Sequence, residues 1–184
     1  YEYHQSLAGH WGKREISDCV SGVRSLADSN WIDPKRVGLW GGGTASFTVL
    51  WALIRHPEVF HAGVAVFPIL DLVHHFQSCS PAEKAELIWA LGTDHHDELS
   101  TRSPIHSIHS LQRPLCLFAG KQDSLINTDQ LQAVSERMKQ ARIPCWLSIY
   151  ENEGRSWRGH ATYIDYYSKV AGFFDRFLRF RGVD

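Results

Sequence analysis

Apolar side chains recur every three or four residues in several segments of the chain, the spacing that places them on one face of an α-helix. This pattern predicts helices over residues 13–28, 44–55, 128–141 and 162–180. A further helix is expected over 81–91, inside an irregular or helical excursion at 68–103. Between the helices lie short, nearly continuous apolar runs at 36–40, 62–67, 114–119 and 146–150. Such runs are typical of strands that are buried on both faces.

Apolar strands that alternate with helices predict an α/β fold, in which helices cover both faces of a parallel sheet. We expect the strands around Val37, Val64, Leu115 and Leu147 to be parallel neighbours in that order, with right-handed crossovers. Residues 1–184 then form a single domain, without an internal repeat or linker. Four strands are few for so many helices, and the chain starts abruptly, so we expect a partial domain whose first strands are missing.

The strand at 36–40 is then expected to lie at the edge of the sheet. Its outer backbone groups should be unpaired or covered by residues 1–8. An open apolar edge promotes association between copies of a chain. The sequence therefore predicts self-association through this edge.

Composition excludes several classes of partner. The net charge is −1 and no basic stripe or acidic block stands out, which argues against a nucleic-acid or membrane partner. The longest apolar stretch, at 62–70, is too short to span a membrane. No targeting signal is readable. A soluble protein is expected, with the cytoplasm favoured and the compartment otherwise open.

Eleven histidines raise the question of a metal site. The pairs His74-His75 and His95-His96, and His106 with His109, have no carboxylate at a ligand spacing, so neither a metal nor a cofactor is expected. These histidines are predicted to face solvent in loops. The tryptophans, Trp11 and Trp89 among them, are expected to pack in the core or between helix and sheet.

A tight glycine turn joins the apolar run at 36–40 to the helix predicted at 44–55. A strand, a tight turn and a helix form the nucleophile elbow G-x-S-x-G, which needs small residues two positions on either side of its central residue. Gly41 and Ala45 are the small flanks here. The nucleophile position between them is Gly43.

Further motifs accompany this turn in a fixed order along the chain. They are Trp11-Gly12 with Glu15 and Asp18, Asp33-Pro34 with Arg36, Pro57-Glu58 with Phe60, Pro68 with Asp71, Ser103-Pro104, and the run 114–120 with Asp123. Over residues 3–180 this succession resembles the catalytic domain of the prolyl oligopeptidase family, the dipeptidyl aminopeptidases and acylaminoacyl peptidases. The resemblance implies an α/β-hydrolase fold and a serine peptidase. It also implies a β-propeller before this domain in family members.

The resemblance further implies a catalytic triad, and the sequence departs from it at two of three positions. Asp123 follows a buried strand at the place of the triad acid. In the segment Glu153-Gly154-Arg155, Arg155 occupies the position of the histidine base, and an arginine stays protonated and cannot accept a proton. We expect Arg155 and Asp123 to form an ion pair. His160 is the alternative base.

Gly43 has no side chain with which to attack a substrate. Thr44 is the alternative nucleophile, although a β-branched residue suits a strained elbow poorly, and its backbone N–H is expected to be an oxyanion donor. Ser46 should already lie on the helix. The predicted function is therefore a non-catalytic hydrolase relative that holds a peptide or small ester. The alternative is a residual serine-type peptidase or esterase with an unorthodox site.

A second alternative treats the glycine turn as a phosphate cradle at a helix N-terminus, as in nucleotide-binding α/β domains. In the fingerprint G-x-G-x-x-G, the third glycine is replaced by Ser46, and no acidic residue ends the next strand. The nucleotide-binding interpretation is therefore the less favoured of the two.

Overall fold

The protein was analysed as a computed structural model, which describes residues 2–179. The elements alternate as the sequence predicts. In chain order they are α1 (Glu2–Leu7), α2 (Arg14–Asp28), β1 (Gly38–Gly42), α3 (Thr44–Arg55), β2 (Ala62–Val66), α4 (Leu72–Ser78), α5 (Pro81–Leu91), α6 (His96–Thr101), the 3-10 helix η1 (Pro104–Ser110), β3 (Leu115–Gly120), α7 (Thr128–Gln140), β4 (Cys145–Tyr150) and α8 (His160–Leu178). Phe180, at the end of the last predicted helix, lies outside the described residues.

The four strands form one parallel sheet in the order β1-β2-β3-β4, so the predicted strand order is confirmed. β1 starts two residues later than predicted. Lys35 and Arg36 belong instead to a turn, because the Asp33 carboxylate accepts a hydrogen bond from the Lys35 N–H and pairs with the Arg36 guanidinium. At its other end, β1 extends through Gly42, which lies opposite Val66 of β2.

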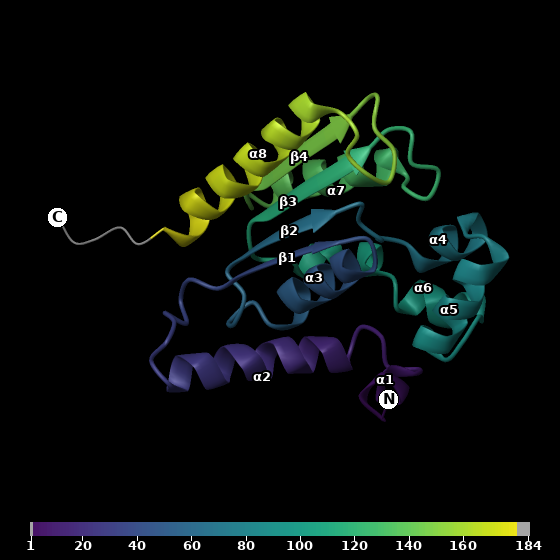
Figure 1. Cartoon of the computed structure of the whole chain (residues 1–184), viewed down its shortest axis with the longest axis horizontal. Coiled ribbons are helices and arrows are strands. Elements are labelled where there is room, and N and C mark those ends of the chain that lie inside the picture. The colour runs from purple at the N-terminus through teal and green to yellow at the C-terminus, as the bar shows by residue number, and fades with distance from the viewer. Residues whose placement is uncertain (1, 180–184) are drawn as a thin grey trace.

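Helices cover both faces of the sheet (Figure 1). α3 packs on β1 and β2, α7 packs on β4, and α2 lies outside α3. α8 packs on the opposite face against β2 and β3. Successive side chains of a strand point to opposite faces, so that Leu117 joins the core below α3 while Phe118 joins the core below α8. This is the α/β-hydrolase arrangement that the sequence predicts.

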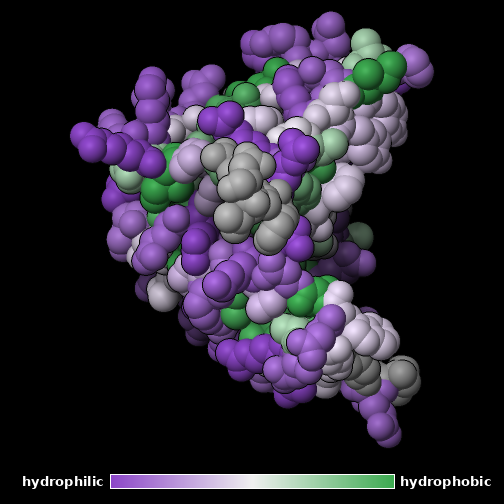
Figure 2. Space-filling view, turned by 90° about the vertical axis from the view of Figure 1, so that its left-hand side faces the viewer, coloured by the Kyte–Doolittle hydropathy of each residue, from purple (hydrophilic) through white to green (hydrophobic). Residues whose placement is uncertain are grey.

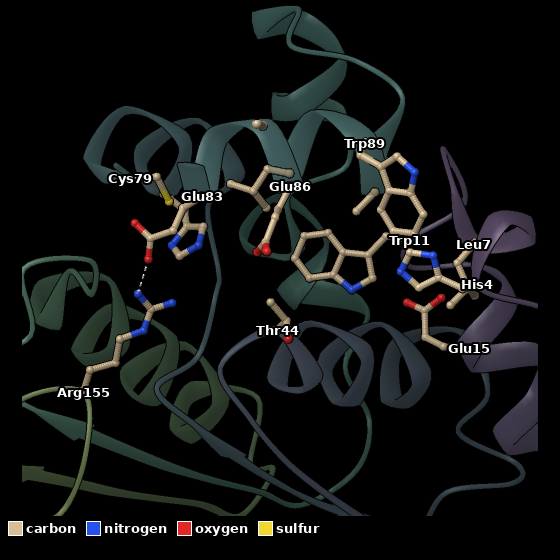
Figure 3. Close-up of a pocket in the computed structure, with 14 residues that line it drawn as sticks. His4, Leu7, Trp11, Glu15, Thr44, Cys79, Glu83, Glu86, Trp89 and Arg155 are labelled. Carbon is tan, nitrogen blue, oxygen red and sulfur yellow. Dashed lines mark hydrogen bonds and ion pairs between the residues drawn. The ribbon is translucent and has the colours of Figure 1, made fainter. Parts of the chain in front are cut away.

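The excursion between β2 and β3 forms α4, α5 and α6, which lie beyond the carboxyl ends of the strands (Figure 1). A capping box starts α5, because the Ser80 hydroxyl bonds the Glu83 N–H and the Glu83 carboxylate bonds the Ser80 N–H. This helix stands over the turn that joins β1 to α3, as Figure 3 shows.

The end of α5 is tied to the beginning of the chain. The last four carbonyls of a helix have no partner inside it, and in α5 each one finds a donor outside. These donors are the Gly92 N–H for Ile88, the Gly9 N–H for Trp89, the Trp11 N–H for Ala90 and the Arg102 guanidinium for Leu91. Residues 2–8 therefore lie against α5 and do not cover β1.

β1 pairs with β2 alone, which leaves its other edge without a neighbouring strand among the described residues. Of the two outcomes predicted for this edge, the unpaired one is confirmed. Figure 2 shows the side of the molecule that lies to the left in Figure 1, where hydrophilic residues predominate and hydrophobic ones appear in small patches. In the part of the chain that the structure describes, every helix is too short or too polar to cross a membrane.

Candidate active site

The turn between β1 and α3 has the backbone of an elbow. Gly43 has φ 57° and ψ −122°, a conformation that residues with a side chain adopt only under strain. A Cβ built on Gly43 meets no atom within 4 Å, whereas a Cβ on Gly41 would lie 2.8 Å from the Ala45 carbonyl oxygen. The flank must therefore be small, and the central position opens onto free space.

Ser46 is a structural residue of this turn. It lies in the first turn of α3 and is fully buried. Its hydroxyl donates to the Gly43 carbonyl at 2.5 Å and accepts from the Ile69 N–H at 3.1 Å. Both contacts hold the elbow against the segment that follows β2. The Gly43 N–H donates to the Val66 carbonyl at 2.8 Å, which removes one of the donors that a phosphate cradle would need.

Asp123 lies just after β3, where the sequence places the acid. Its side chain is buried, and Oδ1 accepts from the Leu125 N–H at 3.0 Å. Oδ2 is also buried and has no hydrogen-bond partner. An unpaired buried carboxylate oxygen is costly, and it leaves Asp123 with a free acceptor at the position where a triad acid holds its histidine.

The loop with Arg155 lies directly beside the loop with Asp123. The Gln122 N–H donates to the Glu153 carbonyl, and a Cβ on Gly120 would collide with the Gly154 carbonyl. The Arg155 side chain nevertheless turns away. Its Nη1 pairs with Oε1 of Glu83 on α5 at 2.9 Å.

The predicted ion pair between Arg155 and Asp123 is therefore wrong. Hydrogen bonds from the Ser80 backbone and hydroxyl, followed by the one from the Arg155 guanidinium, lower the pKa of Glu83 to about 2, so that Arg155 pairs with a carboxylate that is ionised at neutral pH. The capping box also holds this carboxylate at the start of α5 through its Oε2, while Oε1 is the oxygen that accepts from Arg155.

His75 is a functional candidate that the sequence analysis missed. It lies in α4 and is 4% exposed, so the prediction that it faces solvent in a loop is wrong. Its Nδ1 has no partner, while the backbone of Leu125 hydrogen bonds to the ring. Burial, followed by the nearby Arg155 guanidinium, lowers the pKa of His75, and the Asp123 carboxylate acts in the opposite direction. The ring is thus a neutral imidazole close to both loops.

His160 is the first residue of α8 and is exposed. It does not line the cavity described below. Among residues 2–179, no group of three histidine, cysteine, aspartate or glutamate side chains is arranged to hold a metal ion.

A cavity of about 680 Å³ lies between the elbow and α5 (Figure 3). Thr44 lines it at the start of α3, and Arg155, Glu83 and His75 line it as well. Its remaining lining residues are His4, Leu7, Trp11, Glu15, Cys79, Ala85, Glu86, Leu87, Trp89 and Ala90. Trp11 packs against the core as expected, on Phe47, and also faces the cavity. Trp89 faces the cavity and is 40% exposed, so the expectation that it packs in the core is wrong.

The sequence contains a signal for the helix that carries Glu83 and Glu86. The pattern Ser80-Pro81-x-Glu83 starts a helix, and Glu86 follows at a spacing of three, on the same face as Glu83. No periodicity shows that this face covers the elbow, because the path of an excursion depends on tertiary contacts.

The sequence model of the prolyl oligopeptidase family matches residues 1–181. The chain is 22% identical over 178 residues to dipeptidyl peptidase family member 6 of Caenorhabditis elegans, and 23% identical over 176 residues to inactive dipeptidyl peptidase 10 of Mus musculus. These alignments cover 92% and 95% of this chain but only 24% and 21% of the relatives, so the chain spans about a quarter of their length.

A puromycin-hydrolyzing peptidase of Mycobacterium tuberculosis has the same fold, with a TM-score of 0.91 and 24% identity over 100% of this chain and 29% of that one. The elbow, the order of the strands and the family match over residues 1–181 all support the same assignment. The chain belongs to the prolyl oligopeptidase family.

Proposed function

We propose that this chain is the hydrolase-fold part of a peptidase-type protein that holds a peptide or small ester without cleaving it. The observation that carries the proposal is Gly43. The elbow keeps the backbone of a nucleophile turn, yet its central residue has no atom that can form an acyl-enzyme.

The base position supports the same proposal. Arg155 is a permanent cation, and its guanidinium pairs with Glu83. Asp123 keeps a free acceptor, because no imidazole or other donor among the described residues bonds to its Oδ2. Removal of the nucleophile or base of a triad abolishes most of its catalysis, because the members act as a unit.

The relatives support both parts of the proposal. One mouse relative is named an inactive dipeptidyl peptidase, while other relatives bear the names of peptidases. The cavity above the elbow has a volume in the range of small-molecule sites. Loss of the nucleophile therefore leaves a place in which a ligand can still bind.

A fluorophosphonate probe tests the absence of chemistry, because it labels only an activated hydroxyl. We expect no labelling of this protein under conditions that fully label an active serine peptidase. Isothermal titration calorimetry with short peptides tests binding. Labelling of the parent protein, which has no serine at position 43, would contradict the proposal.

The second candidate function is a slow hydrolase that uses Thr44. The observation that favours it is the position of Thr44, which lines the cavity at the N-terminus of α3. Mass spectrometry of a labelled protein separates the two functions. Labelling that maps to Thr44 and is lost in Thr44→Ala would support the hydrolase.

A further inference from the structure

The cavity above the elbow has two aromatic walls. The Trp11 ring packs on Phe47 with ring centroids 4.3 Å apart, and the Trp89 ring stacks on His4 at 4.5 Å. Each ring is therefore packed against an aromatic neighbour, and His4 lines the cavity together with Trp89. Fixed indole faces bind aliphatic chains and attract cations.

Three carboxylates line the same cavity, and two of them are compensated. Glu83 pairs with Arg155. Oε1 of Glu15 accepts hydrogen bonds from the Gly12 N–H and the Thr48 hydroxyl, while its Oε2 is buried and has no hydrogen-bond partner. The positive charge near Glu15 comes from the Arg55 and Arg102 guanidinium groups, whose pKa values burial lowers and the Glu15 carboxylate raises.

Glu86 is the third carboxylate, and it is exposed to solvent as well as lining the cavity. No hydrogen bond or ion pair involves its side chain within the described part of the chain. Figure 3 shows it extending from α5 toward Thr44, beside Trp11. An anion that faces an aromatic cavity and lacks a partner favours a ligand with a positive charge.

His75 also lines this cavity, but its unpartnered Nδ1 is buried and not accessible to a ligand. The backbone of Leu125 forms a hydrogen bond with one nitrogen of the His75 ring, and Nδ1 is the nitrogen that remains without a partner. A neutral imidazole that donates through one nitrogen can only accept through the other. The cavity thus presents the Glu86 carboxylate to a ligand, while Arg155, the permanent cation in its lining, is paired with Glu83.

We propose that this cavity takes the side chain of a lysine or arginine of a bound peptide. The aliphatic stem packs between Trp11 and Trp89, and the charged end donates to Glu86. The Glu86 carboxylate repels acidic side chains and so disfavours their binding. This inference rests on the proposed binding of peptides and adds the class of residue that the cavity selects.

The test compares three blocked peptides, acetyl-Gly-Xaa-Gly-amide, in which Xaa is lysine, norleucine or glutamate. Blocked ends leave the central side chain as the only charge, and norleucine has a similar stem without the ammonium. Isothermal titration calorimetry should show the lysine peptide binding about tenfold tighter than the norleucine peptide, since hydrogen bonds to charged groups are the stronger class. The glutamate peptide should bind most weakly.

Glu86→Gln keeps the shape of the side chain and removes its charge. This variant should lose the preference for lysine while its affinity for norleucine stays unchanged. Glu136→Gln, at an exposed position on α7 outside the cavity, is the matched control and should keep the preference. Thermal unfolding checks that both variants are folded.

Equal affinity for lysine and norleucine in the parent protein would overturn this inference and leave peptide binding intact. A lysine preference that survives Glu86→Gln would overturn the assignment of the charge to Glu86. Failure of all three peptides to bind would overturn the proposed peptide binding itself, and the inference with it.

Discussion

Two opposing effects act on a side chain placed at Gly43. The backbone conformation disfavours any residue other than glycine, at a cost of about 1–3 kcal/mol. The surrounding space is open, since a Cβ at this position meets no atom within 4 Å. A serine is therefore tolerated at the elbow at a moderate cost in stability, and the chemistry of the position can be tested directly.

Gly43→Ser combined with Arg155→His should restore slow ester hydrolysis. Serine supplies the nucleophile, histidine supplies a base, and the free Oδ2 of Asp123 is available to orient it. Each single change should do little, because neither group works without the other. In p-nitrophenyl ester hydrolysis, we expect the double variant to exceed Gly43→Ser by about tenfold or more, which is less than the roughly hundred- to ten-thousand-fold that an optimally positioned base contributes.

Gly43→Ser combined with Arg155→Gln is the matched control, since it breaks the ion pair with Glu83 without adding a base. It should behave like Gly43→Ser alone. If Gly43→Ser alone equals the double variant, another base serves the site, with His75 and His160 as the candidates, and the assignment of Arg155 to the base position fails.

His75 gives the folded protein a defined response to pH. Burial and Arg155 lower its pKa in the folded state below its ordinary value of 6.5. Below pH 6.5 the unfolded chain therefore binds a proton that the folded chain resists, so this contribution to stability is complete above pH 6.5 and is lost as the pH falls toward the lowered pKa. Urea unfolding should show a smaller loss of stability between pH 7.5 and 5.5 in His75→Gln than in the parent.

The control for this prediction is His96→Gln, at an exposed position on α6. It should keep the pH dependence of the parent. An unchanged slope in His75→Gln would show that the acid sensitivity arises elsewhere, for instance at His61, whose pKa burial also lowers.

At the scale of elements, the close approach of β1 and α3 depends on one glycine. Gly41→Ala forces its Cβ against the Ala45 carbonyl, a backbone atom that cannot move freely. We expect the free energy of unfolding to fall by about 1–3 kcal/mol, the range for overpacked positions. Urea unfolding measures the change.

Gly22→Ala is the matched glycine substitution. Gly22 lies in α2, and a Cβ there meets nothing within 4 Å. Because alanine is the better helix former, this variant should be more stable by about 1 kcal/mol. Equal effects of the two substitutions would contradict the packing argument.

The elements were predictable where the pattern of apolar residues alone determines them. α3 has the predicted bounds 44–55, and α5 the predicted bounds 81–91. The strand order also followed from alternation and right-handed crossovers. The site was predictable only in part: motifs place Gly43 and Asp123 after strands, but the pairing of Arg155 with Glu83 depends on the path of the excursion, which no local pattern encodes.

At the scale of the whole molecule, the open edge of β1 is expected to drive self-association. Trp40 on this strand is 49% exposed. Unpaired backbone groups beside an apolar side chain favour pairing with another copy, and a lysine on an edge strand opposes it. Sedimentation of residues 1–184 should show concentration-dependent oligomers that are reduced in Trp40→Lys.

Trp31→Lys is the control, since Trp31 is 79% exposed but lies in the turn before β1. It adds the same charge away from the edge and should leave association unchanged. A parent protein that stays monomeric over a wide range of concentration would contradict the prediction.

The donors at the end of α5 have a consequence for motion. Two of its last carbonyls are bonded by Gly9 and Trp11 and a third by Arg102, so the helix cannot fray from that end by itself. Local opening of α5 must break contacts with a segment far away in the chain, and the two should open as one cooperative unit. Hydrogen exchange at the amides of Gly9 and Trp11 would then report how often α5 opens away from the cavity. A ligand bound in the cavity would slow that exchange.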